Sequence, residues 1–380
     1  MPFVSEWEES KELPRQLAIE CGKAGLLPCV VGGKNAYDFV SHISMPANYD
    51  YFHELIFIDE LARCASGGVL WGLIEGLQIG LPPVLNFGSD YLKKKVANDC
   101  LTGSACICLA ITEATAGSDV NAIRTSFTKN ESKNCFVVNG SKKWITNGIF
   151  SDYFTVAVKS AETGAISLLL LEKAMPGIKC RRMECQGVWS SGTTFIEFEN
   201  VEVPYAHLIG KEGEGFKYIM KNFNHERWGF VVQANRFARV CLEESIKHAL
   251  KRKTFGKALI NHEVIRLKIA EMARQVEATH AWLENITHQL NTLPFDQAMT
   301  VLAGPISLMK AHSTKVFEYC AREASQIFGG AAYTRSGVGE KIERLYRDVR
   351  AYAIPGGSEE ILLDLGVRQA VKRMGVTGRL

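Results

Sequence analysis

The sequence of 380 residues predicts an α+β protein of several domains, with an all-helical N-terminal domain, a small antiparallel β-domain and a C-terminal four-helix bundle. Three observations predict this: helical periodicity at the start, short β-rich runs between turn residues in the middle, and long amphipathic stretches at the end. Because helical and strand segments are segregated along the chain, a doubly wound parallel sheet is not expected. We place the domains at residues 1–102, 103–208 and 209–380.

The composition excludes several classes of protein. With 47% hydrophobic and 22% charged residues, the chain is neither disordered nor fibrous. Its 44 basic and 41 acidic side chains leave a net charge of +3, which gives no reason to expect nucleic acid or a membrane surface as a partner. Eleven cysteines without a CxxC pair, and a start without a signal segment, predict an intracellular protein. No spacing of His and Cys predicts a metal site.

Three stretches make the first domain helical. Residues Trp7–Gly22 are amphipathic, and Phe52–Ala65 has apolar residues at spacings of three and four. The longest apolar stretch, Gly67–Leu85, carries Glu75 and Gln78. Polar side chains of this kind are costly in lipid, so we interpret the stretch as a packed core helix rather than a membrane span.

The middle of the chain is rich in β-branched and aromatic residues. Its clearest strand-like runs are Phe136–Val138, Tyr153–Val158, Ile166–Leu171 and Phe195–Phe198. Asn139 and Gly140 stand between the first run and Trp144–Ile145, and both residues tolerate the positive φ of a type I′ turn. We therefore predict a hairpin turn at Asn139–Gly140.

Long amphipathic stretches return after a glycine-rich bend. We predict bundle helices over Phe216–Lys251, Val264–Leu290, Pro294–Phe328 and Glu359–Met374. Helices of this length joined by short links are typical of a bundle.

The first of these helices carries an acidic residue on its apolar stripe. Glu226 lies three residues after Phe223 and four before Phe230, so its carboxylate faces the core or a cleft. One interpretation is a buried ion pair with Arg227 or another base. The other is a general base whose pKa is raised by desolvation.

The middle domain carries a second cluster of polar residues. It comprises Thr112–Glu113, Ala116–Asp119 and Trp144–Gly148. Gly and Ser allow the backbone to approach a phosphate-bearing ligand closely, and Trp and Thr suit a flat polar ring. Ordinary turn chemistry is the alternative, because the chain has neither a Walker A pattern nor a strand-linked GxGxxG.

Four segments together resemble the acyl-CoA dehydrogenase flavoprotein family. They are Ile111–Asp119 with Trp144–Gly148, Arg252–Gly256, Gln326–Gly330, and Tyr346–Asp348 with Ile354–Ile361. Their order and spacing extend over nearly the whole chain. The family fold of helical domain, β-domain and four-helix bundle agrees with the partition above, and Phe3–Ala18 corresponds to the latter part of the family's first helix, so we expect a shortened start.

The resemblance implies that FAD lies between the β-domain and the bundle, with its far end held by a neighbouring subunit of a homodimer or homotetramer. Residues expected around the flavin and its phosphates are Leu109, Ile111, Thr112, Gly117, Ser118, Trp144 and Thr146. Residues expected at the partner's pyrophosphate and adenosine are Arg252, Thr254, Phe255, Gln326, Gly329 and Gly330. Ser358 and Glu360 correspond to positions on the adenosine side.

The resemblance also implies a reaction, the α,β-dehydrogenation of an acyl-CoA to the trans-2-enoyl-CoA with flavin N5 as hydride acceptor. Many members place the base where this chain has Gly356, which cannot take a proton. A subset that includes the isovaleryl and long-chain enzymes carries its Glu on the first bundle helix beside an Arg, which Glu226–Arg227 matches. Gly356 would then act on the thioester through its backbone N–H, and Ser118, Arg227 and Gly357 would contact the substrate.

Other activities stay open at this level, because one fold supports several reactions. A dehydrogenase of fatty acid metabolism or β-oxidation would pass its electrons to an electron-transfer flavoprotein. The alternatives are a flavin oxidase or tailoring enzyme acting on a different substrate, and a non-catalytic flavoprotein. Family members occur in the cytoplasm, mitochondrion or peroxisome, so the resemblance leaves the compartment open.

Overall fold

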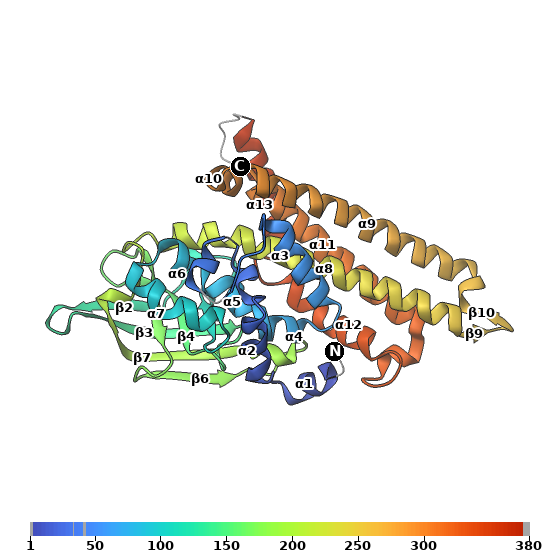
Figure 1. The fold of residues 1–380 in the computed structure, drawn as a ribbon, viewed down its shortest axis with the longest axis horizontal. Helices are drawn as coiled ribbons and strands as arrows, with labels where there is room; N and C mark the ends of the chain where they lie inside the picture. The colour runs from blue at the N-terminus through green and yellow to red at the C-terminus, as the bar shows by residue number, and fades with distance from the viewer. Residues whose placement is uncertain (1–2, 33, 41–42, 375–380) are drawn as a thin grey trace.

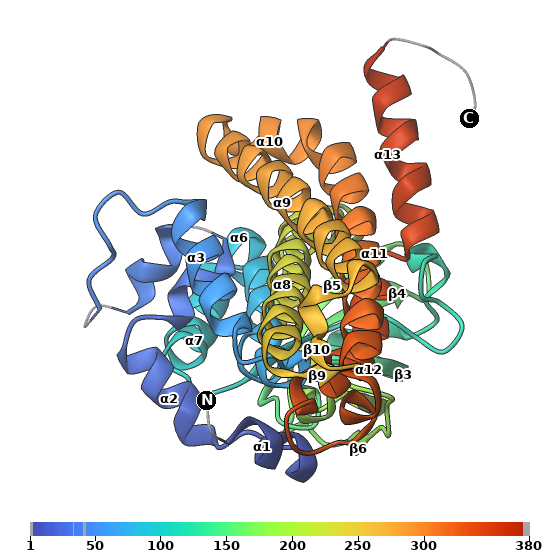
Figure 2. The ribbon, with the colours of Figure 1, turned by 90° about the vertical axis from the view of Figure 1, so that its right-hand side faces the viewer.

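The computed structural model describes residues 3–32, 34–40 and 43–374. It has the predicted fold class, with helices, then a β-sheet, then a helical bundle. Figure 1 shows the sheet at one end of the molecule and the long C-terminal helices running away from it. In Figure 2 these helices are seen nearly end-on, with the N-terminal helices on one flank and the last helix, α13, on the other.

Seven α-helices precede the sheet within the described residues. They are α1 Val4–Ser10, α2 Arg15–Lys23, α3 Tyr51–Ala62, α4 Gly67–Leu70, α5 Gly76–Gly80, α6 Pro82–Phe87 and α7 Asp90–Leu101. The amphipathic helical stretch expected over Trp7–Gly22 forms two helices rather than one continuous helix. Lys11 adopts a left-handed φ of 59° and Pro14 cannot continue a helix from the preceding turn, so the chain breaks into α1 and α2 there.

The apolar stretch is a core helix, as predicted. Residues Gly67–Phe87 form α4, a π-helical turn over Trp71–Glu75, α5 and α6. Within the part of the chain that the structure describes, this is the one helical run with the length and hydropathy of a membrane span, and 89% of its most apolar window is buried inside the protein.

The central sheet contains eight strands. They are β1 Ile107–Ala110, β2 Ser126–Asn130, β3 Cys135–Ile145, β4 Tyr153–Ser160, β5 Ile166–Glu172, β6 Ile178–Arg182, β7 Thr194–Pro204 and β8 Leu208–Ile209. The strand order is β6-β7-β3-β2-β4-β5-β8, with β1 attached to β4. Most pairs are antiparallel, and β4 pairs in parallel with β1 and with β2.

The hairpin predicted at Asn139–Gly140 is wrong. Both residues lie inside β3, where the register against β7 shifts between Val138 and Gly140 as at a β-bulge. The positive φ of Gly140, 143°, serves this irregularity instead of a turn. The chain reverses earlier, where Asn134 adopts a φ of 51° between β2 and β3.

The C-terminal part contains six helices. They are α8 Gly215–Lys251, α9 Glu263–Thr292, α10 Phe295–Val301, α11 Ala303–Phe328, α12 Glu340–Ala353 and α13 Glu359–Arg373, and a hairpin of β9 Lys253–Thr254 and β10 Lys257–Ala258 follows α8. The predicted helix over Pro294–Phe328 is interrupted at Leu302, because Pro305 lacks the N–H that would bond to Val301. Helix α12 was not predicted.

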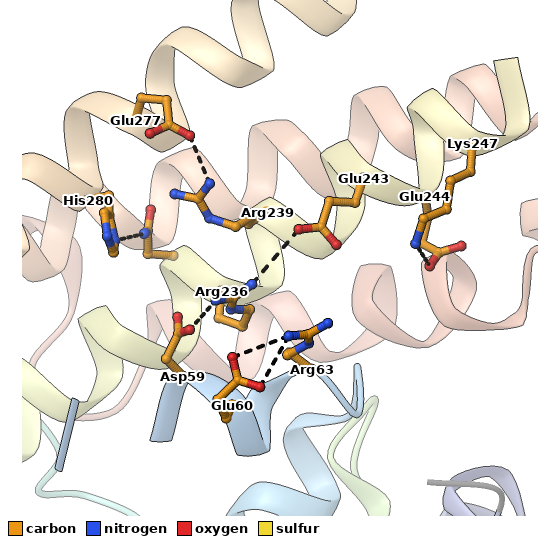
Figure 3. Close-up of polar contacts among 11 residues, drawn as sticks. Asp59, Glu60, Arg63, Arg236, Arg239, Glu243, Glu244, Lys247, Glu277 and His280 are labelled. Atoms are coloured by element: carbon orange, nitrogen blue, oxygen red, sulfur yellow. Dashed lines mark hydrogen bonds and ion pairs between the residues drawn. The ribbon is translucent and has the colours of Figure 1, made fainter. Parts of the chain in front are cut away.

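Helix α8 is the central element, packed against α3, α9 and α11. Figure 3 shows the charged side of this packing, where Arg236 of α8 pairs with Asp59 of α3 and Arg239 pairs with Glu277 of α9 at 2.8 Å. Ion pairs on partly exposed faces contribute only about 0–1 kcal/mol each. The apolar face of α8 therefore supplies most of the stabilisation and positions the residues described below.

Asn147 joins the β-domain to the core helix. Its Nδ2 donates to Trp71 O at 3.0 Å and to Ser191 O at 2.9 Å, and its Oδ1 accepts from Gly76 N at 2.8 Å. A Cβ on Gly76 would lie 2.2 Å from Asn147 Oδ1, so only glycine permits this approach. The contact holds the loop after β3 against the helical turn that contains Trp71.

We expect Asn147→Ala to lower the free energy of unfolding by about 2–4 kcal/mol, because buried groups of Trp71 and Gly76 lose this partner. Urea unfolding followed by tryptophan fluorescence measures the change. Asn200→Ala is the matched control, since Asn200 also has a positive φ, 51°, but lies on the surface. A loss of about 1 kcal/mol or less is expected there, and equal losses in the two variants would contradict the assignment.

Candidate active site

Glu226 lies in the interior on α8, with 6% of its surface exposed. Trp228 and Phe230 beside it are fully or almost fully buried. Its Oε2 is buried and has no hydrogen-bond partner among the described residues. Desolvation raises the pKa of Glu226 to about 7, against the opposing effect of the positive charges of Arg227 and Lys310. A carboxyl group with this pKa can accept and release a proton near neutral pH.

Gly356 lies directly against Glu226, in the turn between α12 and α13. A Cβ at Gly356 would be 3.6 Å from Glu226 Oε1 and 3.3 Å from the Phe230 ring. The backbone also has a left-handed φ of 68° there, and 103° at Gly357. A larger side chain at 356 would thus meet both strain and crowding. A side chain at this position would lie against Glu226 and would have to displace the Phe230 ring slightly.

Arg227 holds the same turn from α8. Its Nε donates to Gly356 O at 2.7 Å, and its guanidinium lies over the Phe223 ring at 5.3 Å. Burial lowers the pKa of Arg227, and the charge of Glu226 opposes that effect. The sequence thus brings a carboxylate, a guanidinium and a glycine turn together, as the positions of Glu226, Arg227 and Gly356 predict.

Two buried ionisable residues at this site were not predicted. Lys310 of α11 is fully buried and bonds to the same turn. Glu75 of the π-helical turn accepts from Gln233 Nε2 at 3.2 Å. Burial and then the charge of Glu226 raise the pKa of Glu75 to about 8, so it holds a proton at neutral pH. Lys310 lies on the stripe of Ile306 and Phe317, so the periodicity argument used for Glu226 would have found it.

Gln233 connects Glu75 to the rest of the site. Its Oε1 accepts from Trp71 Nε1 at 3.1 Å and from the hydroxyl of Tyr352 at 2.8 Å. The rings of Trp71 and Tyr352 both contact Phe230, with centroids at 5.6 and 5.8 Å. Since Asn147 bonds to Trp71, the loop after β3 lies close to this aromatic cluster.

The predicted cofactor residues of the β-domain fall on and around that loop. Trp144 is 48% exposed with a φ of 60°, and Thr146 is half-buried. Gly117 and Ser118 are exposed, and no heavy atom of the described chain lies within 4 Å of a Cβ placed on Gly117. A half-exposed indole, with Lys143 Nζ 4.7 Å from its centroid, and an uncrowded glycine loop fit a flat ring carrying a phosphate.

A buried ion pair shapes the strand end beneath this surface. Lys142 Nζ donates to Glu113 Oε1 and to Ile111 O, both at 2.8 Å. Burial lowers the pKa of Lys142 to about 8, while Glu113 opposes the shift. Thr112, between the two bonded residues, is half-buried, and Leu109 is buried in β1. The pair therefore sets the course of the backbone where Thr112 lies.

The remaining cofactor residues lie elsewhere in the chain's own structure. Arg252, Thr254 and Phe255 belong to the β9–β10 hairpin, which Figure 1 shows at the end of the molecule away from the sheet. Phe255 is 96% exposed. Gln326, Gly329 and Gly330 are exposed at the end of α11, and His248 stacks on Phe328 at 4.2 Å, which places the two segments at the same end of the bundle.

One chain thus does not bring all predicted cofactor residues to Glu226. Ser358 is half-buried immediately before α13, and Glu360 is exposed in the first turn of that helix. The hairpin group has an exposed guanidinium and an exposed ring, and the hairpin itself lies at the end of the molecule away from the sheet (Figure 1). This arrangement suits contact with a second copy rather than with the same chain's site.

Comparison with known proteins divides the chain into the same three parts. Three sequence models match consecutive parts of the chain: the acyl-CoA dehydrogenase N-terminal domain over residues 1–104, the middle domain over 108–201 and the C-terminal domain over 213–371. The acyl-CoA dehydrogenase apdG of Emericella nidulans is 41% identical over 382 aligned residues, which cover 98% of this chain and 87% of that protein.

Solved structures show the same similarity. A probable acyl-CoA dehydrogenase of Mycobacterium abscessus superposes with a TM-score of 0.86 at 33% identity, covering 97% of this chain and 94% of that one. An acyl-CoA dehydrogenase of Bacillus anthracis complexed with FAD has a TM-score of 0.86 at 26% identity, covering 98% of this chain and 65% of that one.

The raised pKa of Glu226 predicts how stability depends on pH. The folded state binds this proton more tightly than the unfolded chain, whose carboxyl pKa is 4.5, so the stabilisation is complete below 4.5 and is lost as the pH rises through about 7. Glu226→Gln stays neutral at every pH. Above about pH 8 we expect the free energy of unfolding of this variant to exceed that of the parent by ~1–3 kcal/mol, and at about pH 4 we expect the two to match. A constant difference at all pH values would contradict the assigned pKa.

Proposed function

The chain belongs to the acyl-CoA dehydrogenase family, and we propose that it converts an acyl-CoA thioester to the trans-2-enoyl-CoA, with Glu226 as the base for the α-proton. The observation that carries the proposal is the contact between Glu226 and Gly356. It combines a buried carboxylate of pKa about 7 with a glycine turn that has no side chain to act as a base.

The residues of the turn supply what a thioester requires. Its α-proton is too weakly acidic for a carboxylate unless the carbonyl oxygen is polarised by a hydrogen-bond donor. A backbone N–H at Gly356 provides such a donor without a side chain, and Arg227 holds the turn through Gly356 O at 2.7 Å. Glu226 then takes the proton and becomes neutral, which its buried surroundings favour. The proton leaves to water after the product departs.

FAD is the cofactor of this proposal. It would be held by Thr112, Ser118, Trp144 and Thr146 of one chain, with Arg252 and Phe255 contributed by a second copy. When bound, it supplies the acceptor for the β-hydride. Trp144 offers an exposed ring for stacking, and Arg252 offers a guanidinium that binds phosphate oxygens in a fork. A homodimer or homotetramer follows from this division, because one chain presents only part of the cofactor residues near Glu226.

The electron acceptor and location complete the proposal. We propose an electron-transferring flavoprotein as the partner that reoxidises the enzyme. We also propose that Ser118, Arg227 and Gly357 contact the acyl-CoA. All eleven cysteines are free thiols, which suits a reducing cell interior. Hydrogen peroxide formed stoichiometrically in air would instead identify an oxidase.

We expect anaerobic addition of acyl-CoAs to bleach the oxidised flavin band of the parent, and Glu226→Gln to slow bleaching by about 10²–10⁴-fold, the usual contribution of a general base. In the parent, the rate should fall as the pH drops below about 7, because Glu226 is then protonated. Stopped-flow absorbance with acyl chains of several lengths measures both effects.

Glu75→Gln is the matched control, because Glu75 is the other buried carboxyl group near Glu226 and already holds a proton at neutral pH. It should bleach at close to the parental rate. Loss of bleaching in Glu75→Gln with retention in Glu226→Gln would assign the base to Glu75. A parent that binds FAD but is bleached by no acyl-CoA would overturn the dehydrogenase proposal.

We expect Arg252→Ala to weaken FAD binding roughly 10- to 100-fold, the effect of losing one charge-assisted contact to phosphate. The flavin-to-protein ratio after dialysis measures it. Lys253→Ala removes a neighbouring exposed cation of the same hairpin and should retain FAD. Equal FAD loss in both variants would indicate a general charge effect and contradict a specific contact by Arg252.

A further inference from the structure

Lys310 is a lysine with none of its surface exposed, on the buried face of α11 between Ile306 and Phe317. Lysine is seldom fully buried unless its ammonium group has partners that compensate for the lost hydration. Burial lowers the pKa of Lys310 to about 7, while the charges of Glu226 and Glu359 oppose that shift. The partners of this ammonium group therefore explain why it is present.

Both hydrogen-bond acceptors of Lys310 belong to the turn that carries Gly356. The Nζ donates to Ala353 O at 3.2 Å and to Gly357 O at 3.0 Å. Ala353 is the last residue of α12, and Gly357 comes shortly before the start of α13. One ammonium group thus binds both ends of the turn, while Arg227 binds Gly356 O between them at 2.7 Å.

The same ammonium group acts on Glu226 through space. Among the positively charged side chains, Arg227 favours the ionised form of Glu226 most strongly, and Lys310 has the second largest effect. The Phe230 ring lies beside both Lys310 and Gly356. Its centroid is 5.7 Å from Lys310 Nζ, and the ring is 3.3 Å from a Cβ placed on Gly356. With little water in this environment, a charge effect of this kind is weakly screened.

We propose that Lys310 is a positioning residue of the reaction, which holds the Ala353–Gly357 turn in register with Glu226 and favours the ionised form of that carboxylate. The inference rests on the proposed function for its kinetic consequences. The hydrogen bonds from Lys310 to the turn and its electrostatic interaction with Glu226 can also be tested by measurements that do not require enzyme turnover. A purely structural lysine would only satisfy these carbonyl groups, so replacing it with an apolar residue of similar length would lower stability but leave the pH profile of the reaction unchanged.

The kinetic test compares FAD-loaded Lys310→Met and Lys310→Arg with the parent by anaerobic stopped flow over a range of pH. Lys310→Met should lower the limiting rate of flavin bleaching roughly 10- to 100-fold, with little change in the dissociation constant of the acyl-CoA. The acidic limb of its pH profile should move to higher pH, because Glu226 loses a neighbouring positive charge. Lys310→Arg should restore the parental limb.

Other charged groups also act on this pair and must stay unchanged in the test. They are Glu75 of the π-helical turn, His225 and Arg227 of α8, and Glu359 of α13. Lys247→Met, which replaces an exposed lysine of α8 that pairs with Glu244 and none of these groups, is the control and should match the parent in rate and in pH profile.

Two readouts do not depend on turnover. Amide hydrogen exchange at residues 354–358, in and directly after the Ala353–Gly357 turn, should be faster in Lys310→Met than in the parent. A double-mutant cycle on urea unfolding should show coupling between Lys310→Met and Glu226→Gln at about pH 7, where ionised Glu226 and protonated Lys310 are both populated. If no acyl-CoA bleaches the parent, the proposed function fails, and these two measurements still decide the role of Lys310.

Several results would overturn the proposal. Lys310→Met with a parental rate and parental pH profile is one. A loss of rate that is equal at every pH is another, because it would indicate a packing defect alone. Absence of coupling together with unchanged exchange of the turn would exclude the role whatever the activity. If Lys310→Met does not fold, the test uses Lys310→Arg. A displaced acidic limb of the pH profile, or faster amide hydrogen exchange of the turn, in Lys310→Arg would then overturn the proposal.

Discussion

The arrangement of the candidate site depends on the burial of one carboxylate, Glu226, against a glycine turn. A buried carboxylate without hydrogen bonds is strongly disfavoured unless it is protonated or lies near positive charge. Here it has both options, because its pKa is raised to about 7 and two cations, Arg227 and Lys310, lie close enough to influence it. The same two cations bind the turn that carries Gly356. A single arrangement therefore sets both the protonation of the carboxylate and the geometry opposite it.

The surrounding fold converges on this arrangement through α8. The helix is 37 residues long, and its apolar face packs on α11 while its flanks contact α3 and α9. From the opposite direction, Asn147 holds the β-domain to Trp71, whose indole bonds to Gln233 of α8. The β-domain and the bundle are thus connected through buried hydrogen bonds, which have defined directions, so the surface that carries Trp144 keeps a constant position relative to Glu226.

Separation of the cofactor residues has a physical consequence for assembly. The loop that follows Trp144 bonds to Trp71 of the aromatic cluster through Asn147, whereas Arg252 and Phe255 lie on an exposed hairpin at the far end of the bundle. Exposed aromatic and arginine side chains are typical of surfaces that bind a partner. A second copy that brings its hairpin to the open surface would complete the set of residues and cover apolar area in the same contact.

The sequence by itself determined the fold class, the burial of Glu226 and the position of Gly356, because helical periodicity and residue type specify which face of a helix is apolar and where a base is impossible. It did not determine the conformation at Asn139–Gly140, where pairing of β3 with β7 produces a bulge in place of the predicted turn. It also did not determine the break between α1 and α2 at Lys11–Pro14. Only the tertiary structure showed that Lys310 and Glu75 belong to the site. Each lies on a buried helical face that the sequence identifies, but the groups it meets come from α12, α13 and α8, far away in the chain. Which buried faces meet is decided by the packing of whole helices, a global property that no local pattern contains.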